Sequence, residues 1–218
     1  MGINIAIDGP AGAGKSTIAK MVSAEMGYIY VDTGALYRTV ALYITENNIP
    51  DGEIEKSLEK ADVSLKFIDG AQRVFLGDRD VSDLIRTPEI SMAASRTSAI
   101  PAVRAYLFET QQKIARENNV IMDGRDIGTV VLPNADVKIF LTASAEERAE
   151  RRYRELSEKP GCPSYEEILE DIKKRDYQDM HRETAPLKQA DDAVLVDTTR
   201  LNLKQSAEKI AEIIRERV

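Results

Sequence analysis

A glycine-rich segment near the start of the chain, residues 9–17 with the sequence GPAGAGKST, constrains the fold more than any other feature. It matches the pattern G-x-x-x-x-G-K-[ST], it follows the short apolar run 3–7, and a helical pattern begins directly after it. In such a loop the backbone N–H groups wrap a phosphate chain, and a side chain at Gly12 or Gly14 would block their approach. The segment therefore predicts a phosphate loop between a buried strand and a helix.

Two polar side chains at the end of this loop suit a triphosphate bound with a metal ion. Lys15 places a positive charge against the outer phosphates, and the hydroxyl of Ser16 can ligate magnesium at the helix start. We therefore predict a triphosphate site made of Gly9, Pro10, Ala11, Gly12, Ala13, Gly14, Lys15, Ser16 and Thr17. Mg²⁺ is the predicted cofactor, with Ser16 as its ligand. A glycine-rich turn that binds nothing is the alternative interpretation.

The composition bounds what the remainder of the chain can be. A length of 218 residues with 43% apolar residues is enough for one domain with a buried core. The single cysteine excludes an internal disulfide, and the single histidine leaves no histidine cluster for a metal. A net charge of −7 argues against nucleic acid polymers as partners, because those need a broad basic surface. Since neither a signal peptide nor a membrane span is apparent, we expect a cytoplasmic monomer without membrane contacts.

The order of apolar runs and helical patterns predicts an α/β fold. Strands are expected at residues 3–7, 28–31, 120–126 (ending in a charged loop), 137–141 and 193–196, with helices between them. This alternation is typical of a parallel sheet covered on both faces, which makes a P-loop three-layer sandwich with a five-stranded parallel sheet. We predict a single domain whose core comprises residues of about 1–61, 98–147 and 184–218.

Two segments interrupt this core pattern. Residues 62–97 begin with alternating apolar and polar residues, a turn at Asp69-Gly70 and a returning strand, and therefore predict a small antiparallel insert with short helices after it. Residues 148–183 contain two helical patterns separated by a break rich in proline and glycine at residues 159–163. We predict that this second segment is a short helical lid.

Four aspartates fall at the ends of predicted parallel strands. Asp8, Asp32, Asp123 and Asp126 each follow an apolar run. In open parallel sheets, ligands bind beyond the carboxyl ends of the strands, so these side chains should border one site. Arg125 lies between two of them. Either this strand end is a turn stabilised by its carboxylates, or Arg125 holds a second phosphate while Asp126 contacts a base.

Arginines at helical spacing mark the predicted lid. Arg148 and Arg152 are four residues apart, and Arg175, Asp179 and Arg182 also share one helix face. Guanidinium groups clamp phosphate oxygens and offset the charge that develops in phosphoryl transfer. Ion pairs with the many neighbouring glutamates are the alternative. Because a bound triphosphate needs countercharge in an acidic chain, the phosphate loop favours the clamp.

Several other residues carry weaker signals. Arg38 and Arg104 are single arginines on helical segments, which are usually surface residues. His181 at a helix end and Cys162 in the lid break are given no chemical role. We interpret Asp80 and Arg86, both in the insert, as structural residues.

Four blocks of sequence together resemble the bacterial cytidylate kinases. They are the phosphate loop, residues 32–38 (DTGALYR), residues 123–128 (DGRDIG), and residues 174–187, which begin with KRD and end with APL. The resemblance spans essentially the whole chain, including the insert. It implies phosphorylation of CMP and dCMP by ATP, with the insert binding the acceptor nucleotide and the lid closing over ATP.

The resemblance also implies which residues bind the acceptor. The implied CMP site consists of Thr33, Arg38, Ser95, Arg104, Arg125, Asp126, Asp179 and Arg182. Of these, three arginines at positions 38, 125 and 182 are implied to hold the phosphate, and Asp179 the sugar hydroxyls. Ser95, Arg104 and Asp126 are implied to meet the cytosine. The base chemistry agrees, because a carboxylate can accept from the N4 amino group while a guanidinium donates to N3 or O2.

The remaining implied roles concern the transferred group. Lys15, Arg152 and Arg175 are implied to be catalytic, and Arg148 to lie near the adenine of ATP. An acceptor phosphate is largely ionised at neutral pH, so no general base is needed. The alternative functions are another small-molecule kinase of this fold, acting on UMP, AMP or shikimate, and a nucleotide-dependent switch or binding module.

Overall fold

A computed structural model describes residues 2–68, 70–158 and 161–218, so Asp69 of the predicted turn and residues 159–160 of the predicted lid break lie outside the described residues. Its main sheet has the order β2-β6-β1-β7-β8, and every pair in it is parallel. The strands are β1 (Asn4–Asp8), β2 (Ile29–Asp32), β6 (Val120–Gly124), β7 (Val137–Thr142) and β8 (Val194–Asp197). The predicted five-stranded parallel sheet is confirmed.

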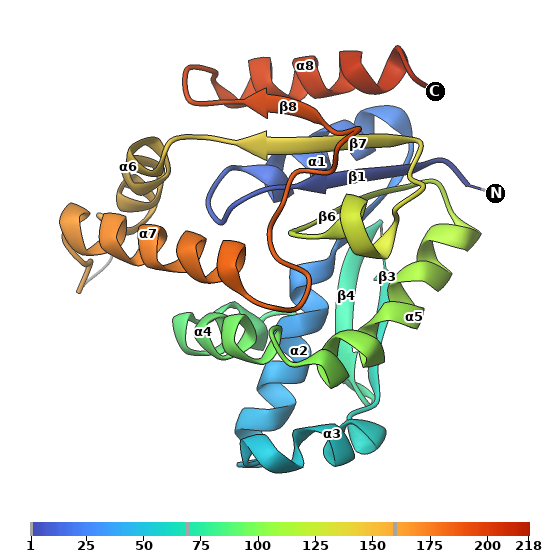
Figure 1. Cartoon of the computed structure of the whole chain (residues 1–218), viewed down its shortest axis with the longest axis vertical. Coiled ribbons are helices and arrows are strands. Elements are labelled where there is room, and N and C mark those ends of the chain that lie inside the picture. The colour runs from blue at the N-terminus through green and yellow to red at the C-terminus, as the bar shows by residue number, and fades with distance from the viewer. Residues whose placement is uncertain (1, 69, 159–160) are drawn as a thin grey trace.

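Helices cover both faces of this sheet (Figure 1). On one face lie α1 (Lys15–Met26) and α8 (Leu203–Arg215), packed on Ile5 and Ile7 of the central strand β1. On the other face, α5 (Pro101–Glu117) and a π-helical turn (Ile127–Val131) pack near Ala6. Because successive strand residues point to opposite faces, a strand between two helical layers must be apolar throughout, as residues 5–7 are. The predicted three-layer α/β fold is therefore confirmed.

The turn after each of the first two strands follows from its local sequence. α1 begins after Gly14, whose φ is 88°, and ends at Gly27 with φ 69°, both left-handed conformations that glycine adopts without strain. The helix after β2, α2 (Thr33–Glu46), is capped by Asp32, whose carboxylate accepts from the backbone N–H of Ala35 at 3.0 Å. These turns place the phosphate loop and the start of α2 side by side at the carboxyl end of the sheet.

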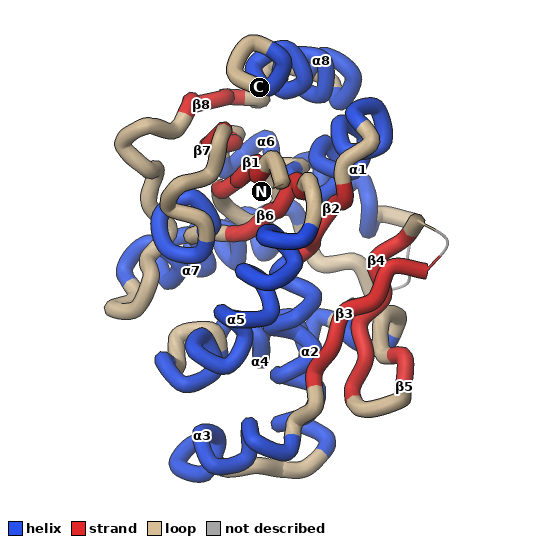
Figure 2. The backbone as a smooth tube through the Cα atoms, turned by 90° about the vertical axis from the view of Figure 1, so that its right-hand side faces the viewer, coloured by secondary structure: helices blue, strands red, loops and turns tan. Residues whose placement is uncertain are grey.

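A second, antiparallel sheet lies apart from the first (Figure 2). Its order is β3-β4-β5, made of β3 (Val63–Ile68), β4 (Ala71–Leu76) and the two-residue β5 (Arg79–Asp80). The 3₁₀ turn Leu84–Arg86 and α4 (Pro88–Thr97) follow it. These elements share an apolar core with α2, α5 and the short helical turns α3 (Ile54–Ser57) and Leu58–Lys60. An exposed 3₁₀ turn, Asp51–Glu53, precedes α3. The antiparallel sheet and its helices were predicted, whereas β5 and the turns between residues 51 and 60 were not.

Two helices near the carboxyl end of β7 form the segment predicted as a lid (Figure 1). They are α6 (Ala145–Leu156) and α7 (Tyr165–His181). Ser164 and Glu167 form a reciprocal capping box at the start of α7, which fixes where this helix begins. The exact limits of core, insert and lid remain predictions.

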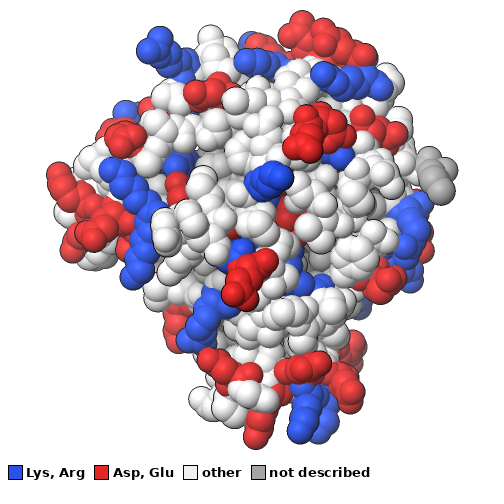
Figure 3. Space-filling view, in the orientation of Figure 1, with Lys and Arg blue, Asp and Glu red and all other residues white. Residues whose placement is uncertain are grey.

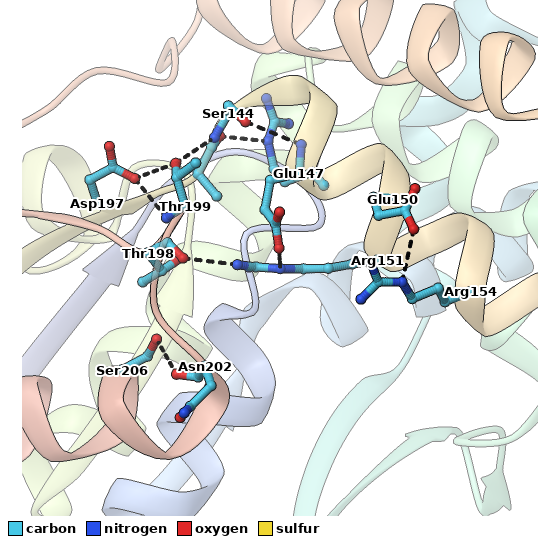
Figure 4. A network of polar contacts seen from close by, with 12 residues as sticks. Ser144, Glu147, Glu150, Arg151, Arg154, Asp197, Thr198, Thr199, Asn202 and Ser206 are labelled. Carbon is cyan, nitrogen blue, oxygen red and sulfur yellow. Dashed lines mark hydrogen bonds and ion pairs between the residues drawn. The ribbon is translucent and has the colours of Figure 1, made fainter.

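The first two turns of α6 are tied to the end of β8 (Figure 4). The Ser144 backbone N–H donates to Thr199 Oγ1 at 3.0 Å. Arg151 donates to Glu147 at 3.0 Å and to the Thr198 carbonyl at 2.9 Å. These hydrogen bonds therefore hold the first two turns of α6 against the end of the main sheet.

Acidic and basic side chains are intermixed on the face seen in Figure 3, which carries no broad area of one sign. None of the helices in the described ranges combines the length and the apolar character that crossing a bilayer requires.

Candidate active site

A cavity of about 460 Å³ opens at the carboxyl ends of β1, β2 and β6, between the phosphate loop, the insert and the two lid helices. Its wall contains most of the residues predicted from the sequence: Ala11, Gly12, Gly14, Lys15, Ser16, Thr17, Thr33, Arg38, Ser95, Arg104, Arg125, Asp126, Arg152, Arg175, Asp179 and Arg182. Segments from widely separated parts of the chain thus meet at one hollow. Gly9, Pro10 and Ala13 belong to the loop but do not line the cavity.

Lys15 is buried at the base of the phosphate loop. Its ammonium group donates to the carbonyl of Pro10 at 2.8 Å, so the side chain folds back along the loop. Burial, together with the nearby Arg125, lowers the pKa of Lys15 to about 7. A phosphate group in the loop would supply the countercharge that this buried cation lacks.

Asp123, at the end of β6, receives bonds from two hydroxyl groups. Ser16 Oγ donates to its carboxylate at 2.8 Å, and the Tyr30 hydroxyl donates at 3.1 Å. Burial, together with the neighbouring Asp32, raises the pKa of Asp123 to about 6. Asp123 was noted at a strand end but was not among the predicted site residues. The sequence offered a reason to include it, because Asp123 directly follows the apolar residues 120–122 of the third predicted strand.

The residues at this point fit a magnesium ion. Within the described ranges there is no group of three or more histidine, cysteine, aspartate or glutamate side chains that could hold a metal. Magnesium in phosphate sites does not need one, because it keeps several waters and takes only one or two protein oxygens with the phosphates. The Ser16 hydroxyl and the Asp123 carboxylate are hard oxygen donors beside the phosphate loop.

Asp8, at the end of the central strand, is fully engaged with the backbone. Its two carboxylate oxygens accept from the N–H groups of Ile127 and Gly128 at 2.8 and 2.7 Å. Burial raises the pKa of Asp8 to about 6 in spite of these bonds. This carboxylate therefore fixes the start of the π-helical turn directly after Asp126.

The other side of the cavity is lined by paired arginines and aspartates. Arg38 contacts Asp32 at 2.9 Å, and Arg125 contacts Asp179 at 2.9 Å. Asp126, nearly inaccessible, is bonded by Arg104. Its other oxygen lies 3.5 Å from Arg182. All these pairs place charged atoms on the wall facing the phosphate loop.

Three guanidinium nitrogens on this wall are buried and have no hydrogen-bond partner among the residues that the structure describes. They are Nε of Arg38, Nε of Arg175 and Nη2 of Arg182. Burial, with the nearby Arg125 and Arg104 respectively, lowers the pKa of the Arg175 and Arg182 guanidinium groups. Buried donors on cations are costly unless an acceptor completes them, so this wall is built to receive an anion.

Arg148 does not line the cavity. Its side chain is 4% exposed, and all three of its guanidinium nitrogens donate to the protein: Nε to the Ala143 carbonyl, Nη1 to the Ala11 carbonyl and to Asp176, and Nη2 to Asp176. The structure therefore places this arginine behind the phosphate loop as a structural tie. The predicted place of Arg148 near the adenine of ATP stays a prediction.

Several residues outside the predicted set also line the cavity. Arg86, which we interpreted as structural, reaches its wall from the insert, and Lys20 and Tyr37 do so from α1 and α2. The Tyr37 ring lies 5.5 Å from the Arg104 guanidinium carbon. Tyr37 lies in the block 32–38 that supports the family resemblance, but neither it nor Arg86 nor Lys20 was assigned a role in the site from the sequence. His181 instead stacks on the exposed Tyr177 with ring centroids 4.0 Å apart, outside the cavity wall.

Comparison with known proteins agrees with this site. The sequence model of the family described as "Cytidylate kinase" matches residues 5–216. A protein named cytidylate kinase from Caldicellulosiruptor bescii is 52% identical over 214 residues, covering 97% of this chain and 95% of that protein. A cytidylate kinase from Carboxydothermus hydrogenoformans is 51% identical, covering 97% of both chains.

A solved structure of an uncharacterized protein from Eubacterium ventriosum is similar in fold only, with a TM-score of 0.57 at 13% identity and full coverage of both chains. The match to the family, by contrast, extends from the first strand to the last helix and includes the phosphate loop, the insert and the lid helices. The chain therefore belongs to the cytidylate kinase family.

Proposed function

We propose that the protein transfers the terminal phosphoryl group of ATP to CMP and dCMP, forming ADP and CDP or dCDP. Membership of the cytidylate kinase family supports this assignment. The observation that carries it in the structure is the opposition, across one cavity, of a phosphate loop and three buried guanidinium nitrogens that have no hydrogen-bond partner among the described residues. A kinase that joins two phosphate-bearing substrates needs two anion sites facing each other.

On the donor side, backbone N–H groups of residues 11–17 hold the triphosphate, and the Lys15 ammonium leaves the Pro10 carbonyl to contact the outer phosphates. Ser16 and Asp123 would hold Mg²⁺, which neutralises phosphate charge when bound. Because the loop is fixed at the start of α1, these groups need little rearrangement during the reaction.

On the acceptor side, Arg38, Arg125 and Arg182 hold the phosphate of the nucleotide, and Asp179 contacts its sugar. Among the described residues, Arg38 Nε and Arg182 Nη2 are buried without a hydrogen-bond partner, although Arg182 Nη2 lies 3.5 Å from Asp126. The attacking phosphate oxygen has a second pKa near ~6, so it is already ionised at neutral pH and requires no general base. Catalysis then depends on alignment and on charge neutralisation.

Two lid arginines, Arg152 and Arg175, contact the phosphoryl group during its transfer. Arg175 is buried with an unpartnered Nε, whereas Arg152 is about half exposed and pairs with Glu155 at 3.1 Å. Both side chains line the cavity, so closure of α6 and α7 over ATP would bring them to the developing charge and exclude water. Excluding water protects ATP from hydrolysis while the acceptor is in place.

Base selection rests on the buried Arg104–Asp126 pair, with Ser95 beside it. The carboxylate accepts from the cytosine N4 amino group, and the guanidinium donates to N3 or O2. Uracil presents a carbonyl to Asp126 and an N–H to Arg104, so each mismatched buried group costs about 1–3 kcal/mol. We therefore expect UMP to be a poor acceptor. The assignment to the cytoplasm and the monomeric state stay predictions.

An ADP-release assay with ATP and a panel of acceptors tests this function. CMP and dCMP should stimulate release strongly, while UMP, AMP and shikimate should not. Stimulation by a different acceptor, and not by CMP or dCMP, would show that the protein uses that acceptor as its substrate. Slow ADP release that no acceptor accelerates would instead favour a nucleotide-dependent switch.

A further inference from the structure

Gln72, on β4 of the insert, forms two hydrogen bonds with a single residue of the main sheet. Its side-chain oxygen accepts from the backbone N–H of Asp32 at 2.7 Å, and its side-chain nitrogen donates to the backbone carbonyl of Asp32 at 3.0 Å. In the part of the chain that the structure describes, these are the two hydrogen bonds that join β4 to β2. The sequence alone gave no reason to single out this residue.

The position of Asp32 explains why a carboxamide suits this contact. Among the described strands, β2 is an edge strand, with β6 on one side and no strand of the main sheet on the other. The last peptide groups of such a strand need partners, because unpaired backbone groups in a partly buried place are costly. A glutamine side chain carries the same donor and acceptor as a peptide unit, so Gln72 substitutes for one residue of a neighbouring strand.

Packing around this contact is incomplete. A cavity of about 640 Å³ lies between α1, β2 and β4, and Gln72, Asp32, Phe67 and Ala24 are among the residues that line it. Where a hollow separates two elements, few van der Waals contacts hold them together. Apolar residues of β3 and β4 pack on α2, so the two hydrogen bonds of Gln72 add a directional, polar attachment of β4 to the end of β2.

The side chain of Asp32 connects this contact to the acceptor side of the active site. One of its carboxylate oxygens accepts from the Ala35 N–H at 3.0 Å and caps α2. The other accepts from Arg38 Nη2 at 2.9 Å. The Nε of Arg38 is buried without a hydrogen-bond partner among the described residues, and its side chain lines the active-site cavity. The main-chain placement of Asp32 thus sets where Arg38 points.

We propose that Gln72 is a positioning residue for the acceptor phosphate. By holding both main-chain groups of Asp32, it makes the correct placement of Arg38 depend on the insert sheet being seated against β2. This inference rests on the proposed function, because it takes Arg38 to be a ligand of the acceptor phosphate. Gln72 itself does not line the active-site cavity and contacts no substrate.

The test uses Gln72→Leu, which keeps the size of the side chain and removes both hydrogen-bonding groups. We expect the KM for CMP to rise about tenfold while the KM for ATP changes less than about twofold. Gln112→Leu is the matched control, because Gln112 also donates to a backbone carbonyl, that of Val131 at 3.0 Å, but lies outside the cavity wall. Its two KM values should stay at wild type, and the two variants should unfold at similar denaturant concentrations.

A double-mutant cycle separates positioning from a general weakening of the insert. If Gln72 acts through Arg38, adding Gln72→Leu to an Arg38→Met protein should change the KM for CMP less than about twofold. A tenfold rise in that background too, or an equal rise in the KM for ATP, would overturn the proposal. An unchanged KM for CMP in the single variant would also overturn it.

The two proposals fail in different ways. A wild-type protein that does not phosphorylate CMP would refute the proposed function, whatever the variants do. A wild-type protein that phosphorylates CMP, with Gln72→Leu indistinguishable from Gln112→Leu, would refute only the role of Gln72.

Discussion

Arg148 and Asp176 form a two-pronged ion pair, with Nη1–Oδ1 and Nη2–Oδ2 distances of 3.0 and 2.5 Å. The same guanidinium group donates to the carbonyl of Ala11 in the phosphate loop at 3.0 Å. One buried side chain thus joins both lid helices and the loop. Since every nitrogen is occupied by the protein, this cation serves the structure of the site.

Replacing Arg148 by Met should destabilise the fold strongly. The change leaves the Asp176 carboxylate, whose side chain is 15% exposed, without its partner. Breaking a buried pair on one side costs about 3 kcal/mol. Urea unfolding measures this loss. Arg154→Ala on the same helix is the control, because its pair with Glu150 is 72% exposed on the arginine side and should contribute less than about 1 kcal/mol. Equal losses in the two variants would contradict the structural role of Arg148.

Replacing Asp126 by Asn should change base selection. An amide of the same size can donate to the O4 of uracil, whereas the carboxylate can only accept. We expect kcat/KM for CMP to fall about 10- to 100-fold and the ratio of UMP to CMP use to rise, with the KM for ATP little changed. Steady-state kinetics with both acceptors gives these ratios. If CMP and UMP were affected equally, Asp126 would not read the base.

Replacing Lys15 by Met should abolish turnover without unfolding the protein. The variant loses the ammonium group that folds against the phosphate loop at Pro10, and losing such a stabilising charge costs about 10²–10³-fold or more in kcat. Stability should not fall, because the change removes a cation whose pKa burial holds near about 7. Circular dichroism and phosphoryl-transfer assays check both points, with Lys204→Met as control, since Lys204 is 83% exposed. Wild-type activity in the Lys15 variant would remove its catalytic role.

The pH dependence of stability should carry a signature of Asp8. Burial raises the pKa of Asp8 from 3.8 to about 6 in the folded state. Between these values the folded chain holds a proton that the unfolded chain has released, so this group's contribution to stability falls as the pH rises from about 4 to about 6. We expect the free energy of unfolding of wild type, relative to Asp8→Asn, to decline over this window and then level off.

Asp80 supplies a control of opposite sign. Hydrogen bonds from Ser82, followed by the bond from Arg73, hold the pKa of Asp80 at about 2, below its ordinary 3.8. Its contribution is therefore fully present above about pH 4 and is lost as the pH falls towards 2. The difference between wild type and Asp80→Asn should be flat from pH 4 to 6. No slope for Asp8→Asn would show that burial does not raise the pKa of Asp8. An equal decline for Asp80→Asn would show that the slope seen with Asp8→Asn is not specific to Asp8.

The sheet and the phosphate loop were predictable because their causes are local. Each strand is an apolar run between turn residues, and the loop pattern occupies eight consecutive positions, 9–16. The limits of most helices follow from caps within three residues, such as Asp32 with Ala35. By contrast, the π-helical turn Ile127–Val131 depends on Asp8, more than a hundred residues earlier, and was not predicted.

The arginines show the same limit within the site. Helical spacing placed Arg148 and Arg152 on one face, but it could not tell that the first is buried against Asp176 and Ala11 while the second is half exposed. Arg86 and Gln72 carry no local pattern at all, and their importance comes only from what the fold brings beside them. Residue spacing thus predicts which side chains share a helix face, whereas only the tertiary structure shows which groups that face contacts.

Asp123 connects the two halves of the cavity through different atoms of one residue. Its carboxylate accepts from Ser16 on the phosphate-loop side, while its main-chain carbonyl accepts from Thr33 Oγ1 at 2.8 Å at the start of α2. Because one residue contacts both substrate sites, a change on one side of the cavity should also affect the other side. A new acceptor-binding segment grafted at the start of α2 would disturb Asp123, which also contacts the phosphate loop. In directed evolution, the preferences for the phosphate donor and for the acceptor should therefore change together.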